Sequence, residues 1–103
     1  MAEPYEILLS DDIDGELEEI FDYIAQDSPT HAAKLIAQIR DAIEGLQFFP
    51  LRQIVEGEEL SPNPLRSLPV GNYMIFFRVF ETRRVVRVLH VRHGARRRFM
   101  GLN

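Results

Sequence analysis

The residues of this sequence that could do chemistry gather near its C-terminal end, in the run His93-Gly94-Ala95-Arg96-Arg97-Arg98. Histidine is the side chain that gains or loses a proton near neutral pH. Arginine binds carboxylate or phosphate through a planar fork of N–H donors. Nine of the twelve basic residues lie between residues 60 and 103, and all nine are arginines. This part of the chain therefore suits an anionic partner.

Proton carriers to accompany these arginines are scarce. The only lysine, Lys34, falls in a predicted helix, Tyr73 is the one tyrosine of the C-terminal half, and Glu81 falls in a predicted turn. His90 and His93 are three residues apart, so a regular strand points them to opposite faces, where they make a poor base–acid pair. We therefore predict that His93 is a strand-end histidine bonded to backbone and that His90 is packed and neutral.

Metal and cofactor chemistry is not indicated by the residue pattern. The three histidines are not at helical ligand spacing, and the chain has no cysteine to act as a thiolate ligand or nucleophile. The sequence contains no glycine-rich phosphate loop and no Gly-x-Ser-x-Gly motif. We therefore expect no metal and no cofactor.

The two parts of the chain carry opposite charge. Residues 1–59 hold 15 of the 16 acidic side chains against three basic ones, a net charge of −12. Residues 60–103 hold nine arginines against one acid, a net charge of +8. A basic surface attracts an acidic partner and steers its approach. Part of the acidic first helix is also expected to pair with arginines of the sheet.

The length of 103 residues, with 46% of them hydrophobic, predicts one globular domain over residues 1–103. No apolar run approaches the ~20 residues of a membrane-spanning helix, and the N-terminus lacks the basic start and apolar middle of a signal peptide. The absence of cysteine excludes a disulfide framework. We expect a cytoplasmic protein without membrane contact.

Two amphipathic helices are predicted in the N-terminal half. A strand-length run at residues 5–9 is followed by residues 10–12, Ser-Asp-Asp, which we expect to cap a helix with their side chains. Apolar residues over 13–24 then recur at the spacing of one helix face. Residues 27–29, Asp-Ser-Pro, separate this helix from a second with an apolar stripe over 32–46. The short connection predicts an antiparallel helix hairpin.

The C-terminal half is predicted to form a β-meander. Residues 51–64, rich in proline and acidic residues, indicate a loop. Strands are expected at residues 65–70, 73–80 and 85–91, joined by tight turns. The middle run is apolar on both faces except for one arginine, which is typical of a central strand. The predicted order β-α-α-β-β-β indicates an α+β two-layer domain, in which a three-stranded antiparallel meander covers the helix hairpin.

Several motifs in this order resemble the RelE/ParE toxin superfamily of type II bacterial toxin–antitoxin systems, over nearly the whole chain. The motifs are Leu17 to Ala25, Asp27-Ser28-Pro29, Ala32-Ala33, Leu46-Gln47-Phe48-Phe49-Pro50, Arg66 to Phe77 and Val88 to Arg97. The ending His93-Gly94-Ala95-Arg96 is similar to that of the ParE branch.

The resemblance implies one of two activities. ParE-like members poison DNA gyrase by direct contact and have no established reaction of their own, whereas RelE-like members cut messenger RNA on the ribosome. Both are neutralised by an antitoxin whose acidic C-terminal segment folds onto the toxin. We expect a ParE-like gyrase poison with a ParD-like antitoxin and no sequence-specific DNA binding. The alternatives are a RelE-like ribonuclease and a non-toxic homologue.

The arginines are the candidate contact residues. A gyrase poison needs no catalytic residue, and for it we expect target and antitoxin to bind a set of eight residues: Arg66, Arg78, Arg87, Arg92, His93, Arg96, Arg97 and Arg98. A ribonuclease needs a base and cations around the reacting phosphate, and its candidates are His93, Arg66 and Arg96. Arg83 and Arg84, in a predicted turn, are expected only to protect sheet edges and to serve solubility.

Overall fold

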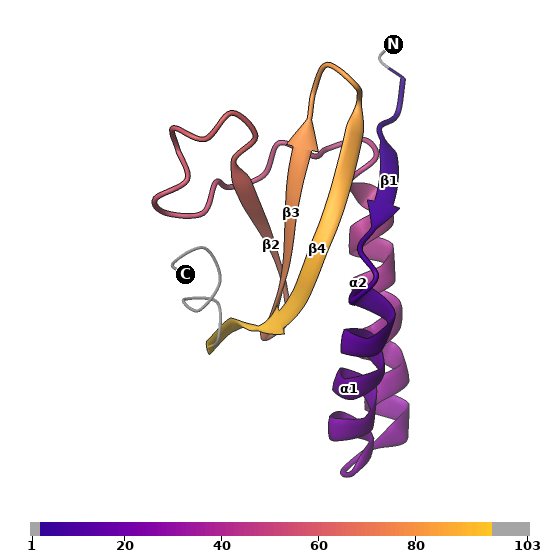
Figure 1. The fold of residues 1–103 in the computed structure, drawn as a ribbon. Coiled ribbons are helices and arrows are strands. Elements are labelled where there is room, and N and C mark those ends of the chain that lie inside the picture. The colour runs from indigo at the N-terminus through magenta and orange to yellow at the C-terminus, as the bar shows by residue number, and fades with distance from the viewer. Residues whose placement is uncertain (1–2, 96–103) are drawn as a thin grey trace.

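The computed structural model describes residues 3–95, which follow the order β-α-α-β-β-β (Figure 1). Strand β1 spans Glu6–Leu9, helix α1 spans Ile13–Ala25 and helix α2 spans Pro29–Gly45. The remaining strands are β2, Leu65–Val70, β3, Tyr73–Phe80, and β4, Val85–His93. The predicted α+β fold class is confirmed, and only the last strand runs two residues longer than expected.

The apolar stripes of both helices form one half of the core. The buried helix residues are Ile13, Leu17, Ile20, Ala32, Leu35, Ile39 and Ile43. Their spacing of three and four residues places them on one face of each helix, which packs on the sheet. Figure 1 shows the two helices side by side on one side of the sheet, as the predicted hairpin requires.

The two helices begin differently. Ser28 caps α2 as predicted, because its hydroxyl accepts a hydrogen bond from the His31 N–H at 3.1 Å and Pro29 takes the first helical position. The predicted side-chain cap of α1 is wrong, since Asp12 makes no such bond. The Ser10 hydroxyl instead donates to the Leu89 carbonyl at 2.9 Å, because the chain passes along the edge of β4 before entering the helix.

The sheet has the order β1-β4-β3-β2, and β2, β3 and β4 form the predicted antiparallel meander. β1 lies parallel to β4, and pairs Glu6 with Val85 through Leu9 with Val88. β1 therefore covers only the first half of β4, and the edge of residues 89–93 is left to other partners. This open half of the edge is where α1 begins to run beside the sheet.

Arg84 holds the N-terminal segment beside the turn between β3 and β4. Its guanidinium lies 4.3 Å from the ring centre of Tyr5 and donates to the Glu3 carbonyl, while the Glu6 N–H bonds to the Arg84 carbonyl. The prediction that Arg84 only protects a sheet edge and serves solubility is therefore wrong. The parallel pairing of β1 brings the N-terminal segment to this turn, which no local sequence pattern indicates.

Strand β3 is buried on both faces, as its apolar run predicts. Phe77 is fully buried against the helices, and its neighbour Phe76, on the opposite face, is also buried. The loop of residues 51–64 runs along the free edge of β2. The Val55 N–H bonds to the Leu65 carbonyl at 2.8 Å and the Ser67 N–H bonds to the Gln53 carbonyl at 3.0 Å. This loop protects an edge that would otherwise be open to pairing.

Candidate functional site

A β-bulge in β4 decides which side chains share a face of the sheet. Val88 pairs with Phe77 and His90 pairs with Phe76, so Leu89 between them has no partner on β3. One extra residue shifts the alternation of the strand by one. Side chains on either side of Leu89 that a regular strand would point in opposite directions therefore come to lie on the same face.

The bulge brings arginines together on the face of the sheet that points away from the helices. Arg87 and Arg92 are five residues apart, and in a regular strand they would face opposite ways. Val88 and Val91 both lie in the helix-facing core, so the register places Arg87 and Arg92 on the other side, from which the Arg92 side chain reaches round the β4 edge to Glu16 of α1. Arg78 pairs with Arg87 across the strands and shares that side. We call Arg78, Arg87 and Arg92 the arginine face.

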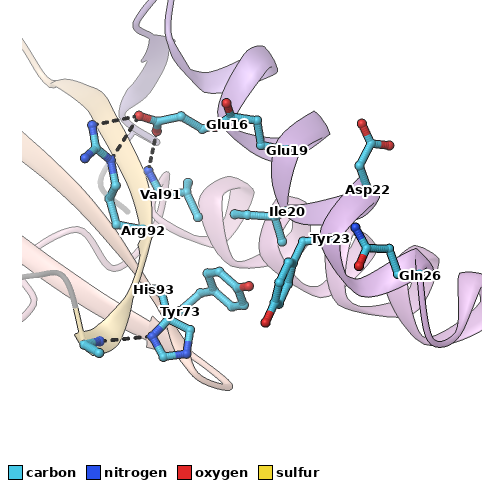
Figure 2. A pocket seen from close by; sticks show the side chains of 11 residues that line it. Glu16, Glu19, Ile20, Asp22, Tyr23, Gln26, Tyr73, Val91, Arg92 and His93 are labelled. Atoms are coloured by element: carbon cyan, nitrogen blue, oxygen red, sulfur yellow. Dashed lines mark hydrogen bonds and ion pairs between the residues drawn. The ribbon is translucent and has the colours of Figure 1, made fainter.

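Arg92 is tied to α1 through Glu16 (Figure 2). Oε2 of Glu16 accepts from Arg92 Nε at 3.2 Å and lies 2.8 Å from His90 Nδ1. Oε1 of Glu16 accepts from the Val91 N–H at 2.8 Å. The expected pairing of the acidic helix with the sheet is confirmed here. His90 is half-buried, and its contact with the Glu16 carboxylate was not predicted.

Arg78 is bound by the loop of residues 51–64. Its NH1 donates to Glu58 Oε1 at 3.0 Å and to the Asn63 carbonyl at 2.8 Å. The same carboxylate oxygen of Glu58 accepts from the Leu65 N–H at 3.1 Å. The Leu65 N–H and then the Arg78 guanidinium stabilise the charged form, so the pKa of Glu58 lies below its ordinary value of 4.5. Arg78 is thus a partly engaged member of the arginine face.

Arg66 lies apart from the arginine face. It pairs with Phe77, a helix-facing core residue, so it points to the helix side of the sheet, and its NH1 donates to the Arg52 carbonyl at 2.8 Å. His93 pairs with Tyr73 and Tyr73 pairs with Val70, so Arg66 lies four residues further along and two strands away. Four residues span about 13 Å of strand. The structure therefore does not bring His93 and Arg66 together.

His93 is held at the end of β4 by two contacts. Its ring packs edge-on against Tyr73, with ring centres 5.3 Å apart and an interplanar angle of 81°. Its Nδ1 accepts from the Ala95 N–H at 3.1 Å, which places the proton of a neutral ring on Nε2. This is the backbone-bonded arrangement that we predict for a strand-end histidine.

A groove of about 910 Å³ separates α1 from the end of β4 (Figure 2). From α1 it is lined by Glu16, Glu19, Ile20, Asp22, Tyr23 and Gln26, from the strands by Tyr73, Val91, Arg92 and His93, and just after β4 by Ala95. The sequence analysis missed this groove. The one signal available was that the acidic residues and the tyrosine of α1 recur at the spacing of one helix face. This spacing does not indicate which strand that face of α1 lies against.

The predicted contact residues thus differ in their exposure and in their ion pairs. Arg87 is exposed, with no ion pair to any other residue of the described range 3–95. Arg78 and Arg92 are bound by carboxylates that the sequence analysis did not single out, Glu58 and Glu16. The predicted residues Arg96, Arg97 and Arg98 lie outside the described residues.

Between residues 3 and 95, no three His, Asp or Glu side chains are grouped so that they could hold a metal ion. Neither α1 nor α2 is long and apolar enough to cross a membrane.

Comparison with known proteins gives a family and a fold. The family model described as the ParE toxin of the type II toxin–antitoxin system parDE matches residues 7–98. A chain of the chromosomal ParDE toxin–antitoxin system from P. aeruginosa is 18% identical, with a TM-score of 0.68 over 89% of this chain and 98% of that chain. No curated protein matches this chain significantly.

Two further solved structures are similar in fold. A chain of the RelBE2 toxin–antitoxin complex from Mycobacterium tuberculosis is 20% identical, with a TM-score of 0.61 over 87% of this chain and 98% of that chain. A chain of the archaeal RelE–RelB complex from Pyrococcus horikoshii OT3 is 15% identical, with a TM-score of 0.61 over 90% of this chain and 98% of that chain. The arrangement of helices and strands described above is thus common to these toxin–antitoxin proteins.

Proposed function

Because the chain belongs to the ParE toxin family of type II toxin–antitoxin systems, we propose that it is a toxin that poisons DNA gyrase by direct protein contact. A ParD-like antitoxin neutralises it by laying an acidic segment on the arginine face. The protein acts in the cytoplasm, where both partners are found, and it carries out no reaction of its own.

The observation that carries this proposal is the arginine face, with Arg87 at its centre. Arg87 is exposed and its neighbours Arg78 and Arg92 each present a guanidinium that is only partly covered, with 33% and 36% of the side chain exposed. Planar guanidinium groups on a rigid sheet suit carboxylates of a partner protein. A contact surface of this kind needs no acid or base, which agrees with the backbone-bonded state of His93.

Ribonuclease activity is the competing hypothesis, since two of the similar folds belong to complexes named RelBE2 and RelE–RelB. Cleavage by attack of a ribose 2′-OH needs a base near cations that hold the phosphate. His93 is the candidate base, yet its Nδ1 is bonded to the Ala95 N–H and Arg66 lies two strands away. The described residues therefore favour the gyrase hypothesis.

The experiment uses purified gyrase, relaxed plasmid and ATP, with the full chain added. We expect inhibition of supercoiling and the appearance of linear plasmid after detergent and protease treatment. In parallel, primer extension on transcripts from cells that express the chain should show intact messenger RNA. Transcript cuts linked to codon position, lost in a His93→Ala variant and without any cleaved plasmid, would replace this proposal with a ribonuclease.

A further inference from the structure

Strand β1 forms an open edge of the sheet. In the order β1-β4-β3-β2 it has β4 on one side and, among the described residues, no strand on the other, and Figure 1 shows it at the border of the sheet. The opposite border, β2, is covered by the loop of residues 51–64. Natural proteins block open edges with charges, prolines or bulges, because such edges pair with other strands. Residues 7–9 of β1, Ile-Leu-Leu, contain none of these devices.

The backbone groups on the outer side of β1 have no partner in the described part of the chain. The N–H groups of Glu6 and Ser10 bond towards β4, each at 2.9 Å. Because backbone groups of alternate residues point to opposite sides of a strand, those of Ile7 and Leu9 point away from β4. Within residues 3–95, neither of these two residues has a hydrogen-bond partner on that side. The edge therefore presents two donors and two acceptors.

The side chains at this edge are apolar and partly exposed. Leu8 pairs with Arg87 of β4, so its side chain lies on the same side of the sheet as the arginine face, and 38% of it is exposed. Leu9 pairs with Val88, which places it on the helix side, and 44% of it is exposed. Free backbone groups together with uncovered apolar side chains suit the edge to pairing with another strand.

We propose that the β1 edges of two copies of this chain pair in antiparallel fashion about a two-fold axis at Leu8, so that two four-stranded sheets join into one. In this register Ile7 lies opposite Leu9 of the second copy. Each such pair exchanges two N–H···O bonds, which uses every free donor and acceptor of the edge. An axis at Ile7 would instead need the Tyr5 N–H, which is already bonded to the Gln47 carbonyl at 2.8 Å.

The sequence of the edge is complementary to itself in this register. Leu8 meets Leu8 of the second copy on one side of the sheet, and Ile7 meets Leu9 on the other. Glu6 meets Ser10, so no like charges stand directly opposite each other. A two-fold interface requires that one surface match itself, and this edge does so. The match identifies a second copy as the occupant.

The pairing gives the arginine face a second half. Arg87 neighbours Leu8, so the two Arg87 side chains of the dimer are separated by three strand spacings, about 14 Å. One acidic segment is then able to contact both. This inference goes beyond the proposed function, and the pairing needs neither gyrase nor an antitoxin, so the two proposals fail independently.

The test measures the mass of the full chain by sedimentation equilibrium. The concentration runs from about 10 µM to about 1 mM, because a short edge makes a small interface and a weak dimer. We expect the mass to rise from that of a monomer towards that of a dimer. Each copy has a net charge of −4, so added salt should not weaken the dimer, whereas it should weaken binding of an acidic segment.

Hydrogen exchange of the ¹⁵N-labelled chain locates the contact. The amide protons of Ile7 and Leu9 should exchange more slowly as the concentration rises. The amide proton of Leu8 points towards β4 and is the internal control, since its exchange should not depend on concentration.

One variant removes a donor of the edge. Leu9→Pro deletes an N–H on the outer side and keeps the N–H groups that bond to β4, as proline does on edge strands. It should weaken dimerisation about ten-fold or more, because each dimer loses two hydrogen bonds. Leu60→Lys, at a position that is 99% exposed on the loop of residues 51–64, should leave dimerisation unchanged.

Two further variants test the axis. Leu8→Lys and Leu8→Glu each place like charges opposite one another and should each weaken dimerisation about five-fold or more. An equal mixture of the two should restore pairing, because lysine then meets glutamate. This restoration requires that residue 8 lie opposite itself. Thermal unfolding checks that each variant is folded, and the Leu8 variants decide if Leu9→Pro is not.

Four results would overturn the proposal. A monomer mass at the highest concentration would exclude a second copy as the occupant. Dimers that persist in Leu9→Pro and in both Leu8 variants would place the contact elsewhere on the protein. Slow exchange of Ile7 and Leu9 at every concentration would mean that another part of the same chain covers the edge. Slow exchange that appears only when an antitoxin is added would assign the edge to a strand of that partner.

Discussion

At the scale of single residues, Glu16 joins parts of the chain that are more than 70 positions apart. Its carboxylate meets His90, the Val91 N–H and Arg92, and only 14% of the side chain is exposed. The Val91 N–H lies on the half of the β4 edge that β1 does not cover. Glu16 therefore replaces the carbonyl of a missing strand neighbour while it orients Arg92 of the arginine face.

Replacement of Glu16 by alanine should lower the free energy of unfolding by about 2 kcal/mol, because partly buried donors lose a charged acceptor. Glu18→Ala, at an exposed position on the same helix, should change it by about 0.5 kcal/mol or less. Urea unfolding of both variants measures the difference. Equal effects of the two substitutions would show that the Glu16 contacts do not stabilise the fold.

Arg87 offers the cleanest test of the arginine face, because it is exposed and its described surroundings contain no ion-pair partner. Arg87→Glu should abolish growth inhibition in bacteria and leave the melting temperature unchanged. Arg83→Glu, also exposed and in the neighbouring turn, should keep the toxicity. Toxicity that survives Arg87→Glu would remove this face from the target contact.

Residue-level predictions succeeded where the reason was local. The bonding of His93 to backbone follows from its place at a strand end. The pairing of Arg66 with Phe77 also follows from a two-residue turn at Gly71-Asn72, which fixes the register. Because β3 is apolar on both faces, however, the register alone does not tell which face meets the helices. The Glu16 contacts depend on tertiary packing and have no local signal.

At the scale of elements, the loop of residues 51–64 is fastened to the sheet by one ion pair. Glu58 bonds to Arg78 of β3 and to the Leu65 N–H at the start of β2. The loop therefore holds Arg78 in place at the arginine face, and an acidic partner must share that guanidinium with Glu58 or displace it.

The stabilisation by Glu58 should depend on pH. Its pKa is lowered in the folded protein, so its contribution is complete above the ordinary value of 4.5 and is lost as pH falls through the lowered pKa. The stability difference between the natural chain and Glu58→Gln should be constant above about pH 5 and shrink below it. Chemical unfolding across a pH series measures this difference.

Glu56→Gln is the matched control, since Glu56 is an exposed residue of the same loop and the described residues give it no ion pair. Its stability should follow that of the natural chain at every pH. A Glu58→Gln difference that persists unchanged in acid would mean that an uncharged contact, and not the ion pair, fastens the loop.

Elements were predictable where periodicity was uninterrupted. Both helices have apolar residues at three- and four-residue spacing. β2 begins after Pro64, and the turn at Gly71-Asn72 separates it from β3, so these limits follow from the sequence. The parallel pairing of β1 with β4 and the bulge at Leu89 were not predictable. Each results from competition between tertiary partners, which a local pattern does not record.

At the scale of the whole molecule, the division of charge along the chain becomes a division between layers. The helices carry acidic residues on their exposed faces, and the outer side of the sheet carries the arginine face. Packed layers lie about 10 Å apart, which exceeds the screening length of about 8 Å at physiological ionic strength. The electrostatic field of each layer therefore acts on a partner largely independently of the other layer.

Association with the antitoxin should consequently depend strongly on salt. The antitoxin is expected in the neighbouring reading frame, as a short protein with an acidic C-terminal segment. Its association rate constant should fall roughly ten-fold or more as salt rises from about 0.01 M to about 1 M, while the dissociation rate changes less. Stopped-flow mixing measures both. A flat association rate would favour apolar docking on the helices.

The bulge at Leu89 can also be viewed as a change of parity. Before it, the even-numbered residues Val86 and Val88 face the helices, and after it the odd-numbered residues Val91 and His93 do so. Loss of codon 89 would remove only the unpaired residue, so that every pair with β3 would be kept, Val91 would still face the helices and Arg92 would stay on the other side. In genetic terms, this one-codon deletion straightens the strand and leaves the residues of each surface unchanged.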